Sequence, residues 1–427
     1  MATAWPNLGA VNFLLASFLL TALSAPTSRQ APSPMSGPLV LLVSFDGFRW
    51  DYLDRTATPA FDSLVAGGVK ARYVFDTFVS KTFPNHYTIA TGLYQESHGI
   101  VGNNMYDPAS GERFSLKNKL KPEWWNGGEP IWVTNQRQGG KSGLIMYPGM
   151  EVKIRDRYAS FRLPKYNATF PYDERVNIIT SLFANGSINL GLLYFDEPDH
   201  SGHSFGPSSP EMNSVIQMCD STLAYLMTKL RDAGLEDRVD VIVTSDHGMA
   251  DVSPQDFMQL DDFVDSSLYT VTDNNPVIGI WPNIDSDIQV IYEKLRDASP
   301  HVSVYLKDDI PAQYHYRDNS RIAPILLVAE EGWSIHRGNH SGDYRLSYRG
   351  NHGYNNSLMS MHPIFVASGP SFRQGLIVEP FENVNIYPLM CKILGIEPAP
   401  NNGSLEKVQD MLRFSEIETA LPTTALP

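Results

Sequence analysis

"PLVLLVSFDGF" (residues 38–48) is a continuous apolar run that ends in an acid and a glycine. The segments "INLGLLYFDEPD" (188–199) and "VDVIVTSDHGM" (239–249) follow the same plan. A strand that is apolar along its whole length is buried on both faces, which is typical of a parallel sheet covered by helices on its two sides. These three segments therefore predict the central strands of such a sheet.

Helical patterns accompany these strands. "SPEMNSVIQMCDSTLAYLMTKLRDAGL" (209–235) has apolar residues at helical spacing, begins at a serine-proline pair and ends near Gly234. "APILLVAEEGW" (323–333) predicts a further strand, and "NVNIYPLMCKILGI" (383–396) predicts a closing helix. Because strands alternate with helices, the sequence indicates an α/β fold.

Acids and histidines follow the three strands at their carboxyl ends, where parallel sheets gather their ligand sites. The candidate ligands are Asp46, Thr82, Asp199, His203, Asp246, His247 and His352. Carboxylate and imidazole ligands suit zinc or a similar divalent ion, and this set is large enough for two ions. Taken singly, Asp246-His247-Gly248 would pass for a strand-exit turn and Asp199 with His203 for a surface pair. Their delivery to one sheet edge favours a metal site.

Thr82 lies in "KTFPNHY" (81–87), ahead of an aromatic residue, a proline, an amide and a histidine. In isolation such a threonine reads as a strand end or a turn residue. A hydroxyl bound to a metal ion, however, loses much of its pKa and becomes an effective nucleophile. Beside the candidate ligands, Thr82 is therefore the candidate nucleophile.

The composition of the chain limits the size of its core and the kinds of ligand that it can bind. The 427 residues, 42% of them hydrophobic, are enough for one large core or two modest ones. The formal net charge of −14 argues against binding of nucleic-acid polymers, whose affinity comes largely from a basic face. An acidic protein that handles anionic phosphates needs local positive charge, which bound metal would supply.

The two ends of the chain and its sequons indicate the secretory route. Residues 1–25 contain an apolar run too short to span a bilayer, followed by small residues, which predicts a signal peptide. Residues 26–37 predict a disordered leading segment, and residues 411–427 predict a flexible tail or stalk. The glycosylation sequons begin at Asn167, Asn185, Asn339, Asn355 and Asn402. We expect an extracellular protein, either secreted or held by a membrane anchor beyond the sequence given.

The two cysteines allow at most one internal disulfide, so the chain is no disulfide scaffold. Cys219 falls at helical spacing with apolar residues, a pattern that faces a core. We expect Cys219 and Cys391 to be buried free thiols, with a bridge between them as the alternative.

Five motifs resemble those of the ectonucleotide pyrophosphatase/phosphodiesterases, a family of the alkaline phosphatase superfamily. They are "LVSFDGFRWDYL", "KTFPNHYTIATGLYQESHGIVGNNMYD", "YFDEPDHSGHSFGP", "VTSDHGM" and "GNHGY". The likeness runs from about residue 38 to residue 410, and phrases such as "VYLKDDIP" look closest to the short fourth and fifth members. It implies one catalytic domain over 38–410, with a central, mostly parallel sheet flanked by helices and a small inserted cap-like segment.

The resemblance also implies roles for individual residues. It assigns one Zn²⁺ to Asp199, His203 and His352 and a second to Asp46, Asp246, His247 and Thr82. It makes Thr82 the nucleophile that carries a nucleotidyl group until water hydrolyses it, and Asn103 a donor to a phosphate oxygen. The nucleobase would lie among Phe83, Leu116, Tyr147, Tyr166 and Tyr194. Tyr147 and Glu151 stand where several members carry tryptophan and aspartate, so the base preference stays open.

The resulting hypothesis is an extracellular zinc hydrolase of phosphodiester or pyrophosphate bonds in small nucleotides. Dinucleoside polyphosphates, NAD and ATP-like compounds are the implied substrates, and a nucleoside 5′-monophosphate is the product. The alternative is hydrolysis of choline phosphodiesters or lysophospholipids on the same two-zinc site. An adhesion ectodomain without chemistry would lack ligands, and the whole set is present. A sulfatase requires Cys or Ser followed two residues on by Pro and then Arg. "TFPNH" has the proline but no cysteine or serine before it and no arginine after it.

Overall fold

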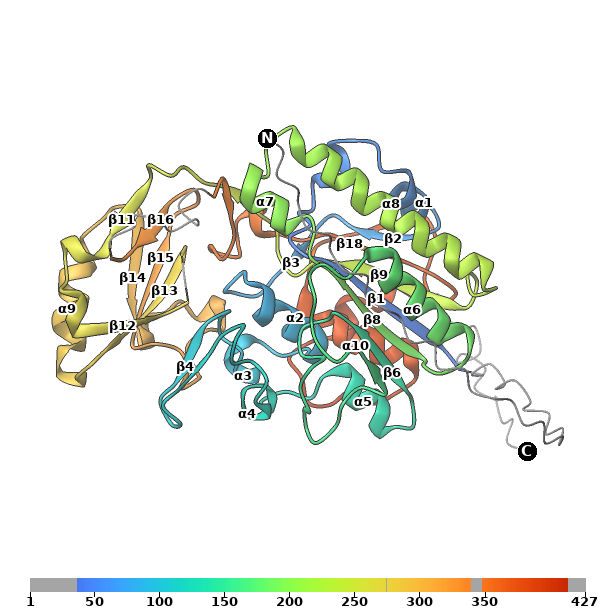
Figure 1. Cartoon of the computed structure of the whole chain (residues 1–427), viewed down its shortest axis with the longest axis horizontal. Coiled ribbons are helices and arrows are strands. Elements are labelled where there is room, and N and C mark those ends of the chain that lie inside the picture. The colour runs from blue at the N-terminus through green and yellow to red at the C-terminus, as the bar shows by residue number, and fades with distance from the viewer. Residues whose placement is uncertain (1–36, 274, 339–347, 414–427) are drawn as a thin grey trace, which may run out of the picture.

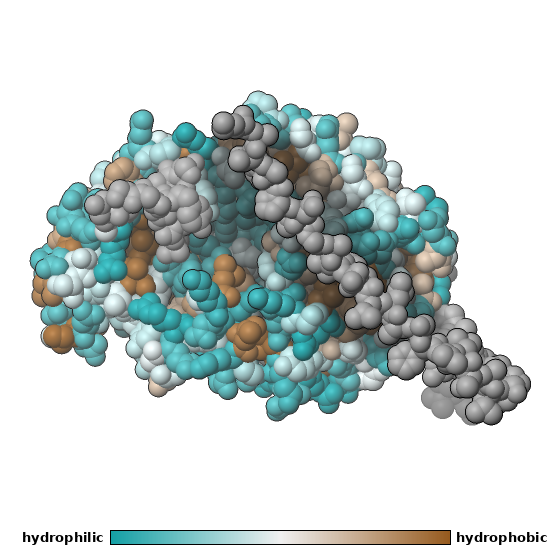
Figure 2. Space-filling view, viewed as in Figure 1, coloured by the Kyte–Doolittle hydropathy of each residue, from teal (hydrophilic) through white to brown (hydrophobic). Residues whose placement is uncertain are grey.

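The computed structural model describes residues 37–273, 275–338 and 348–413. The predicted signal peptide and the sequon at Asn339 lie outside these ranges, as do nearly all of the leading segment and most of the predicted tail. Met411 and Leu412 are buried, so the packed fold extends to the last described residues. The face drawn in Figure 2 is largely hydrophilic, with small separate hydrophobic patches.

The core of the molecule is an eight-stranded sheet in which the predicted strands lie side by side (Figure 1). In spatial order its strands are β19 (Leu376–Val378), β2 (Gly68–Ala71), β18 (Phe365–Ser368), β9 (Val239–Thr244), β1 (Leu39–Phe45), β8 (Leu190–Phe195), β6 (Ser142–Ile145) and β7 (Phe161–Arg162). The five strands from β9 to β7 are mutually parallel, while β18 runs antiparallel to both of its neighbours. The sheet is therefore mostly parallel, as predicted.

The register of the three central strands places their carboxyl ends at the same height in the sheet. Ser44 of β1 pairs with Tyr194 of β8 on one side and with Thr244 of β9 on the other. Every residue of these three strands is buried, which explains their continuous apolar sequences. Asp46 and Asp246 each follow a paired residue by two positions, so both acids leave the sheet at the same edge.

Helices cover both faces of this sheet (Figure 1). One layer consists of α1 (Pro59–Ala66), α6 (Tyr172–Ala184) and α8 (Glu211–Asp232), and the other of α2 (Thr82–Thr91), α5 (Ile131–Arg137) and α10 (Ile386–Leu394). The structure thus confirms helices within 209–235 and 383–396. In the described part of the chain no helix combines the length and apolarity needed to cross a bilayer.

A second, smaller sheet lies to the left in Figure 1 and has its own hydrophobic core. Its antiparallel strands, in spatial order, are β12 (Tyr269–Thr272), β13 (Val277–Pro282), β15 (Ile325–Ala329) and β14 (Val302–Leu306), with α9 (Ile288–Leu295) alongside. The strand predicted within 323–333 is β15, which belongs to this sheet and not to the main one. It is fully buried, because it is central there, and so it reads like a strand of a parallel sheet.

Short elements complete the fold and connect its two sheets. The paired strands are β3 (Val74–Phe75) with β20 (Phe381–Glu382), β4 (Met105–Asp107) with β5 (Glu112–Phe114), β10 (Ala250–Asp251) with β17 (Gly350–Asn351), and β11 (Phe257–Gln259) with β16 (Ser334–His336). The short helices are α3 (Gln95–His98), α4 (Pro122–Trp125) and α7 (Asp199–Phe205). Cys219 and Cys391 are buried and free, as expected.

Candidate active site

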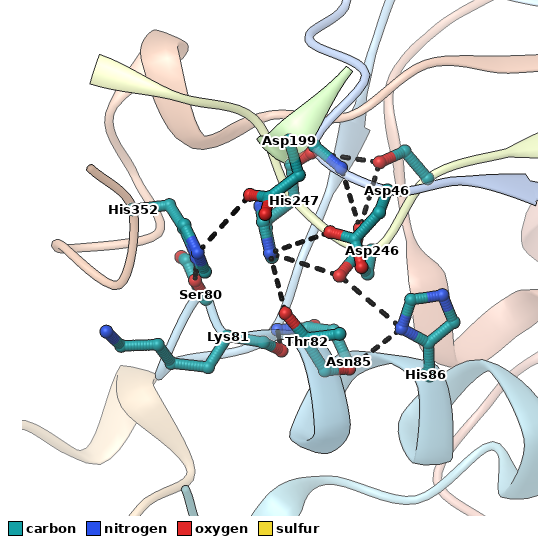
Figure 3. A network of polar contacts seen from close by, with 12 residues as sticks. Asp46, Ser80, Lys81, Thr82, Asn85, His86, Asp199, Asp246, His247 and His352 are labelled. Atoms are coloured by element: carbon teal, nitrogen blue, oxygen red, sulfur yellow. Dashed lines mark hydrogen bonds and ion pairs between the residues drawn. The ribbon is translucent and has the colours of Figure 1, made fainter. Parts of the chain in front are cut away.

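Six of the predicted ligands form two compact groups at the carboxyl ends of the central strands, which we call the ligand edge (Figure 3). Asp199, His203 and His352 make the first group, and Asp46, Asp246 and His247 make the second. In the first, the Nε2 atoms of His203 and His352 each lie 3.5 Å from Asp199 Oδ1. In the second, His247 Nε2 lies 3.0 Å from Asp246 Oδ2 and 3.5 Å from Asp46 Oδ1. The His247 and His352 rings stack at 3.6 Å, so the groups adjoin.

The three histidines of the ligand edge have the same orientation. Each Nδ1 bonds a backbone carbonyl: His203 that of Gly350 at 2.9 Å, His352 that of Ser80 at 2.7 Å, and His247 that of Gly248 at 2.8 Å. A carbonyl can only accept, so Nδ1 carries the proton and the Nε2 lone pair turns toward the acids. This is the tautomer and the outer hydrogen bond that metal-binding histidines have.

One oxygen of each aspartate at the ligand edge is buried without a hydrogen-bond partner among the described residues: Asp46 Oδ1, Asp199 Oδ1 and Asp246 Oδ2. These are the oxygens that the imidazole Nε2 atoms face. Lone pairs on carboxylate and imidazole repel each other unless a cation or a proton lies between them. Burial, and then the charges of Asp246 and Asp199, raise the pKa of Asp46 well above its ordinary value. The donor set therefore fits a metal ion in each group.

Local sequence explains how the two groups meet. Gly47, directly after Asp46, has a positive φ of 68°, and a Cβ there would lie 2.9 Å from the Cα of Asp199. Only glycine permits both the left-handed backbone and this close approach. The backbone N–H of Asp199 in turn donates to the carbonyl of Asp46 at 2.9 Å. In α7, Asp199 and His203 are one turn apart and reach the same point, as their spacing predicted.

Thr82 is the first residue of α2 and lies beside the second group. Its Oγ1 is 3.4 Å from His247 Nε2 (Figure 3). The positive end of the helix dipole at this position favours negative charge, whether on the hydroxyl or on a bound phosphate. Asn103 lies close by, because its Oδ1 accepts from the N–H of Phe83 at 3.0 Å. That bond leaves the amide group of Asn103 as a donor.

A cavity of about 770 Å³ opens from the ligand edge, and all five residues predicted around the nucleobase line it. We call these residues the aromatic wall: Phe83, Leu116, Tyr147, Tyr166 and Tyr194. Leu116 is 69% exposed at the lip, whereas Tyr147 is 1% exposed and donates to the carbonyl of His86. Tyr194 donates to Asp46 Oδ2 at 2.6 Å, so it also orients a ligand. Phe83 and Tyr166 are left as the ring walls.

Lys119 is a cavity residue that sequence reasoning missed. Its Nζ lies 5.6 Å from the centroid of the Phe83 ring and 5.5 Å from that of Tyr166, within cation–π distance of both ring walls. It forms an ion pair with Glu151 at 2.7 Å, with side chains 14% and 10% exposed. Glu151 also accepts from the N–H of Tyr166. No periodicity or strand end marks Lys119, because it lies between β5 and α4 in irregular backbone.

His86 also escaped the sequence analysis, although it lies one helical turn after Thr82. Its Nδ1 donates to the carbonyl of Thr82 at 2.8 Å, and Ser44 Oγ lies 2.8 Å from its Nε2. Burial lowers the pKa of His86, which keeps the ring neutral. His86 thereby ties the first turn of α2 to β1, and its Nδ1 lies 3.4 Å from Asp246 Oδ2.

Comparison with known proteins gives consistent matches. Residues 40–355 match the family described as "Type I phosphodiesterase / nucleotide pyrophosphatase". The chain is 45% identical over 415 residues to the human ectonucleotide pyrophosphatase/phosphodiesterase family member 5, covering 96% of this chain and 85% of that protein. It is also 45% identical over 384 residues to a Xenopus laevis bis(5′-adenosyl)-triphosphatase, covering 89% of this chain and 83% of that protein.

Solved structures agree with the sequence matches. The murine member 5, as an inactive form in complex with AMP, superposes with a TM-score of 0.85 at 44% identity, covering 88% of this chain and 100% of that one. A structure of the human member 5 gives the same TM-score at 45% identity, covering 88% of this chain and 100% of that one. This chain therefore belongs to the type I phosphodiesterase / nucleotide pyrophosphatase family and is a hydrolase with the alkaline-phosphatase-like fold.

Proposed function

We propose that this protein hydrolyses phosphodiester or pyrophosphate bonds of small nucleotides with two Zn²⁺ ions and Thr82 as nucleophile, releasing a nucleoside 5′-monophosphate. One observation carries the proposal. The two ligand groups adjoin each other, the Thr82 hydroxyl lies beside the second group, and a cavity lined largely by aromatic side chains opens from them.

Two ions would be held by the two groups of the ligand edge, with the Thr82 hydroxyl beside the second group. The unpartnered carboxylate oxygens and the inward Nε2 atoms supply the mixed O and N donors that zinc prefers. When bound, such ions lower the pKa of a neighbouring hydroxyl and offset the negative charge of a phosphate group.

The residues of the chain would divide the reaction between them. Thr82 Oγ forms a bond to the phosphorus that carries the nucleoside, the bond from this phosphorus to the leaving group breaks, and the hydroxyl proton goes to solvent. Asn103, fixed through its Oδ1 by the N–H of Phe83, donates from its amide to a phosphate oxygen as charge develops. Water then hydrolyses the nucleotidyl-threonine, which restores Thr82 and frees the 5′-monophosphate.

The aromatic wall would bind the base. Phe83 directly follows Thr82, and its ring is held edge-to-face against Phe114 and Trp125, so it is a rigid surface. Tyr166 would provide the second wall, and the Lys119 ammonium group lies near both rings. Stacking on two aromatic rings suits a flat nucleobase. The binding of AMP by the murine relative supports this role.

Two observations favour nucleotides over choline esters. The Xenopus laevis relative is named a bis(5′-adenosyl)-triphosphatase, which supports dinucleoside polyphosphates as the substrate class. In addition, the Lys119 ammonium group lies 5.6 Å from the Phe83 ring centroid and 5.5 Å from that of Tyr166, so a trimethylammonium group bound against these rings would meet a like charge. Two like charges in a partly desolvated pocket repel each other. We infer that choline phosphodiesters are the poorer substrates.

We further propose one catalytic domain over residues 38–410 and an extracellular site of action. The apolar leader and the five sequons support secretion. Of the sequon residues, Asn167, Asn185, Asn355 and Asn402 lie in the described part of the chain, and each of them retains at least partial exposure.

The test is hydrolysis of a nitrophenyl ester of a nucleoside 5′-monophosphate by wild type and Thr82→Ala, with and without a chelator. Thr222→Ala, another helix threonine, on α8 away from the cavity, is the matched control. We expect activity in wild type and Thr222→Ala that the chelator abolishes, and none in Thr82→Ala. Full activity in Thr82→Ala, or activity that survives the chelator, would overturn the mechanism. Diadenosine polyphosphates, NAD, ATP and a choline ester then rank the substrates.

A further inference from the structure

The segment from Thr77 to Lys81 delivers the nucleophile to the ligand edge and is neither helix nor strand. It enters α2 directly at Thr82. The carbonyl of Ser80 in this segment accepts from His352 Nδ1, so the segment also orients a histidine of the first ligand group (Figure 3). Because no regular ladder satisfies its backbone, the segment takes most of its hydrogen bonds from side chains, besides those of the Lys81 N–H to Val79 and of the Asn85 N–H to Lys81.

Both polar atoms of the Asn85 side chain form hydrogen bonds with this segment. Its Oδ1 accepts from the N–H of Thr77 at 2.8 Å and from Thr77 Oγ1 at 2.9 Å. Its Nδ2 donates to the carbonyls of Thr77, Val79 and Lys81 at 3.1, 3.0 and 3.2 Å. Asn85 is fully buried in the first turn of α2, and Asn383 Nδ2 donates to it from behind at 2.9 Å.

Gln95, the first residue of α3, forms hydrogen bonds with the same segment from a second helix. Its Oε1 accepts from the N–H of Val79 at 2.9 Å. Its Nε2 donates to the carbonyl of Val79 at 2.8 Å, and to the carbonyl and Oγ1 of Thr77 at 3.1 Å each. Like Asn85, this amide is fully buried.

We propose that Asn85 and Gln95 are positioning residues, which fix the Thr77–Lys81 segment so that the Thr82 hydroxyl and His352 stay in register with each other. Nearly all bonds of the two amides converge on this one segment, and the segment contacts both the nucleophile and a ligand. The inference deepens the proposed function and rests on the role that it gives Thr82. A displacement of about 1 Å between reacting groups can reduce a rate by about 10²-fold.

The test uses isosteric changes that remove donors. In Asn85→Asp and Gln95→Glu the acceptor oxygen stays, while an oxygen replaces the NH₂ group and faces carbonyls. Asn135→Asp is the matched control, because Asn135 is equally buried but bonds Ser142 and Asn189, away from the ligand edge. Zinc-loaded, full-length proteins are compared for kcat and KM on the nitrophenyl nucleotide ester, for AMP affinity and for thermal midpoint.

We expect Asn85→Asp to lower kcat by about 10²-fold and Gln95→Glu to lower it by about tenfold. KM and AMP affinity should remain those of wild type, because the aromatic wall is untouched. Asn135→Asp should lower the thermal midpoint and leave kcat unchanged. Wild-type kcat in both Asn85→Asp and Gln95→Glu, or an equal loss in Asn135→Asp, would overturn the inference. If Asn85→Asp does not fold, Gln95→Glu decides the question alone.

The outcome for the proposed function is separate. Activity in Thr82→Ala would remove the nucleophile and with it the basis for a positioning role. An inactive Thr82→Ala together with wild-type kcat in both amide variants would leave the nucleophile standing and reject only Asn85 and Gln95.

Discussion

The ligand edge and the aromatic wall adjoin in one cavity but are built in different ways. At the ligand edge Asp46 and Asp246 leave level strand ends, Asp199 begins α7, and each histidine is fixed by a hydrogen bond to a backbone carbonyl. The aromatic wall comes from α2, β8 and irregular segments between elements, and its exposure runs from 1% at Tyr147 to 69% at Leu116. Within the aromatic wall, Phe83 and Tyr194 are tied to the ligand edge through Thr82 and Asp46, whereas Leu116 and Tyr166 lie on irregular segments that can vary more freely.

The largest effect should follow from damage to the ligand edge. We expect Asp246→Asn to lower kcat/KM by more than about 10²-fold, the loss typical of partners one shell further out. Zinc added to metal-free wild type should raise the thermal midpoint, since it stabilises the fold by about 2.7 kcal/mol at a hundred times its Kd. Asp246→Asn should lose most of that rise.

Asp240→Asn is the control for this prediction. Asp240 is a buried acid at the other end of the same strand, where it accepts from the N–H and Oγ of Ser371. It should keep both the activity and the zinc response. Two tightly bound zinc ions in Asp246→Asn, counted by elemental analysis, would contradict the assignment of Asp246.

The next effect belongs to the aromatic wall. Tyr166→Ala should weaken binding of a nucleotide ester by about 1–3 kcal/mol, because one stacking surface is removed. The loss should show mainly in KM, and hydrolysis of bis(nitrophenyl) phosphate, which has no base, should stay unchanged. Tyr158→Ala is the control, since Tyr158 is 43% exposed and carries Arg162 over its ring. Equal losses on both substrates would mean that Tyr166 serves the ligand edge instead.

Lys119 tests how the wall selects its ligand. Lys119→Met should raise the ratio of choline-ester to nucleotide-ester hydrolysis by about fivefold, which corresponds to about 1 kcal/mol for a charge that Glu151 already pairs. Lys121→Met, which removes a more exposed lysine paired with Glu112, is the control. An unchanged ratio of kcat/KM values would show that Lys119 does not discriminate between the two substrates.

An effect on stability, and not on activity, concerns α2, which supplies both Thr82 and Phe83. His98 is buried beneath it, accepts from the N–H of Ile100 and bonds Thr88 of α2. Burial lowers the pKa of His98 to about 3. The unfolded chain takes up a proton near pH 6.5 while the folded one does not, so this site reduces stability as pH falls from 6.5 toward 3, by about 1.4 kcal/mol per pH unit.

His98→Asn, which keeps an acceptor for Ile100, should therefore flatten the pH dependence. Metal-free wild type and variant are compared by urea unfolding at pH 7 and pH 5.5. An unchanged difference between the two pH values would assign the acid sensitivity to other groups.

The proximity of the ligand-edge residues was predictable from the sequence, because it depends on local patterns such as strand ends and helical spacing, while their binding of metal stays a prediction. Continuous apolar strands set the level of Asp46 and Asp246, and the spacing of Asp199 and His203 sets one helical turn. The sheet to which β15 belongs was not predictable, because a buried apolar strand looks alike in both sheets. Lys119 was missed for a different reason. Its place near two rings results from tertiary packing of irregular backbone, which leaves no periodic trace.

The position of Gly47 matters for the interpretation of missense variants. It has no side chain, and its backbone N–H donates to Asp246 Oδ1 at 3.1 Å. Any side chain there would meet the backbone of Asp199 and require a left-handed conformation that most residues resist. A missense change at this codon would separate the two loops that carry Asp46 and Asp199. Its phenotype should match the loss of a metal ligand and not that of a surface turn, so a scan of variants would rank position 47 with the active centre.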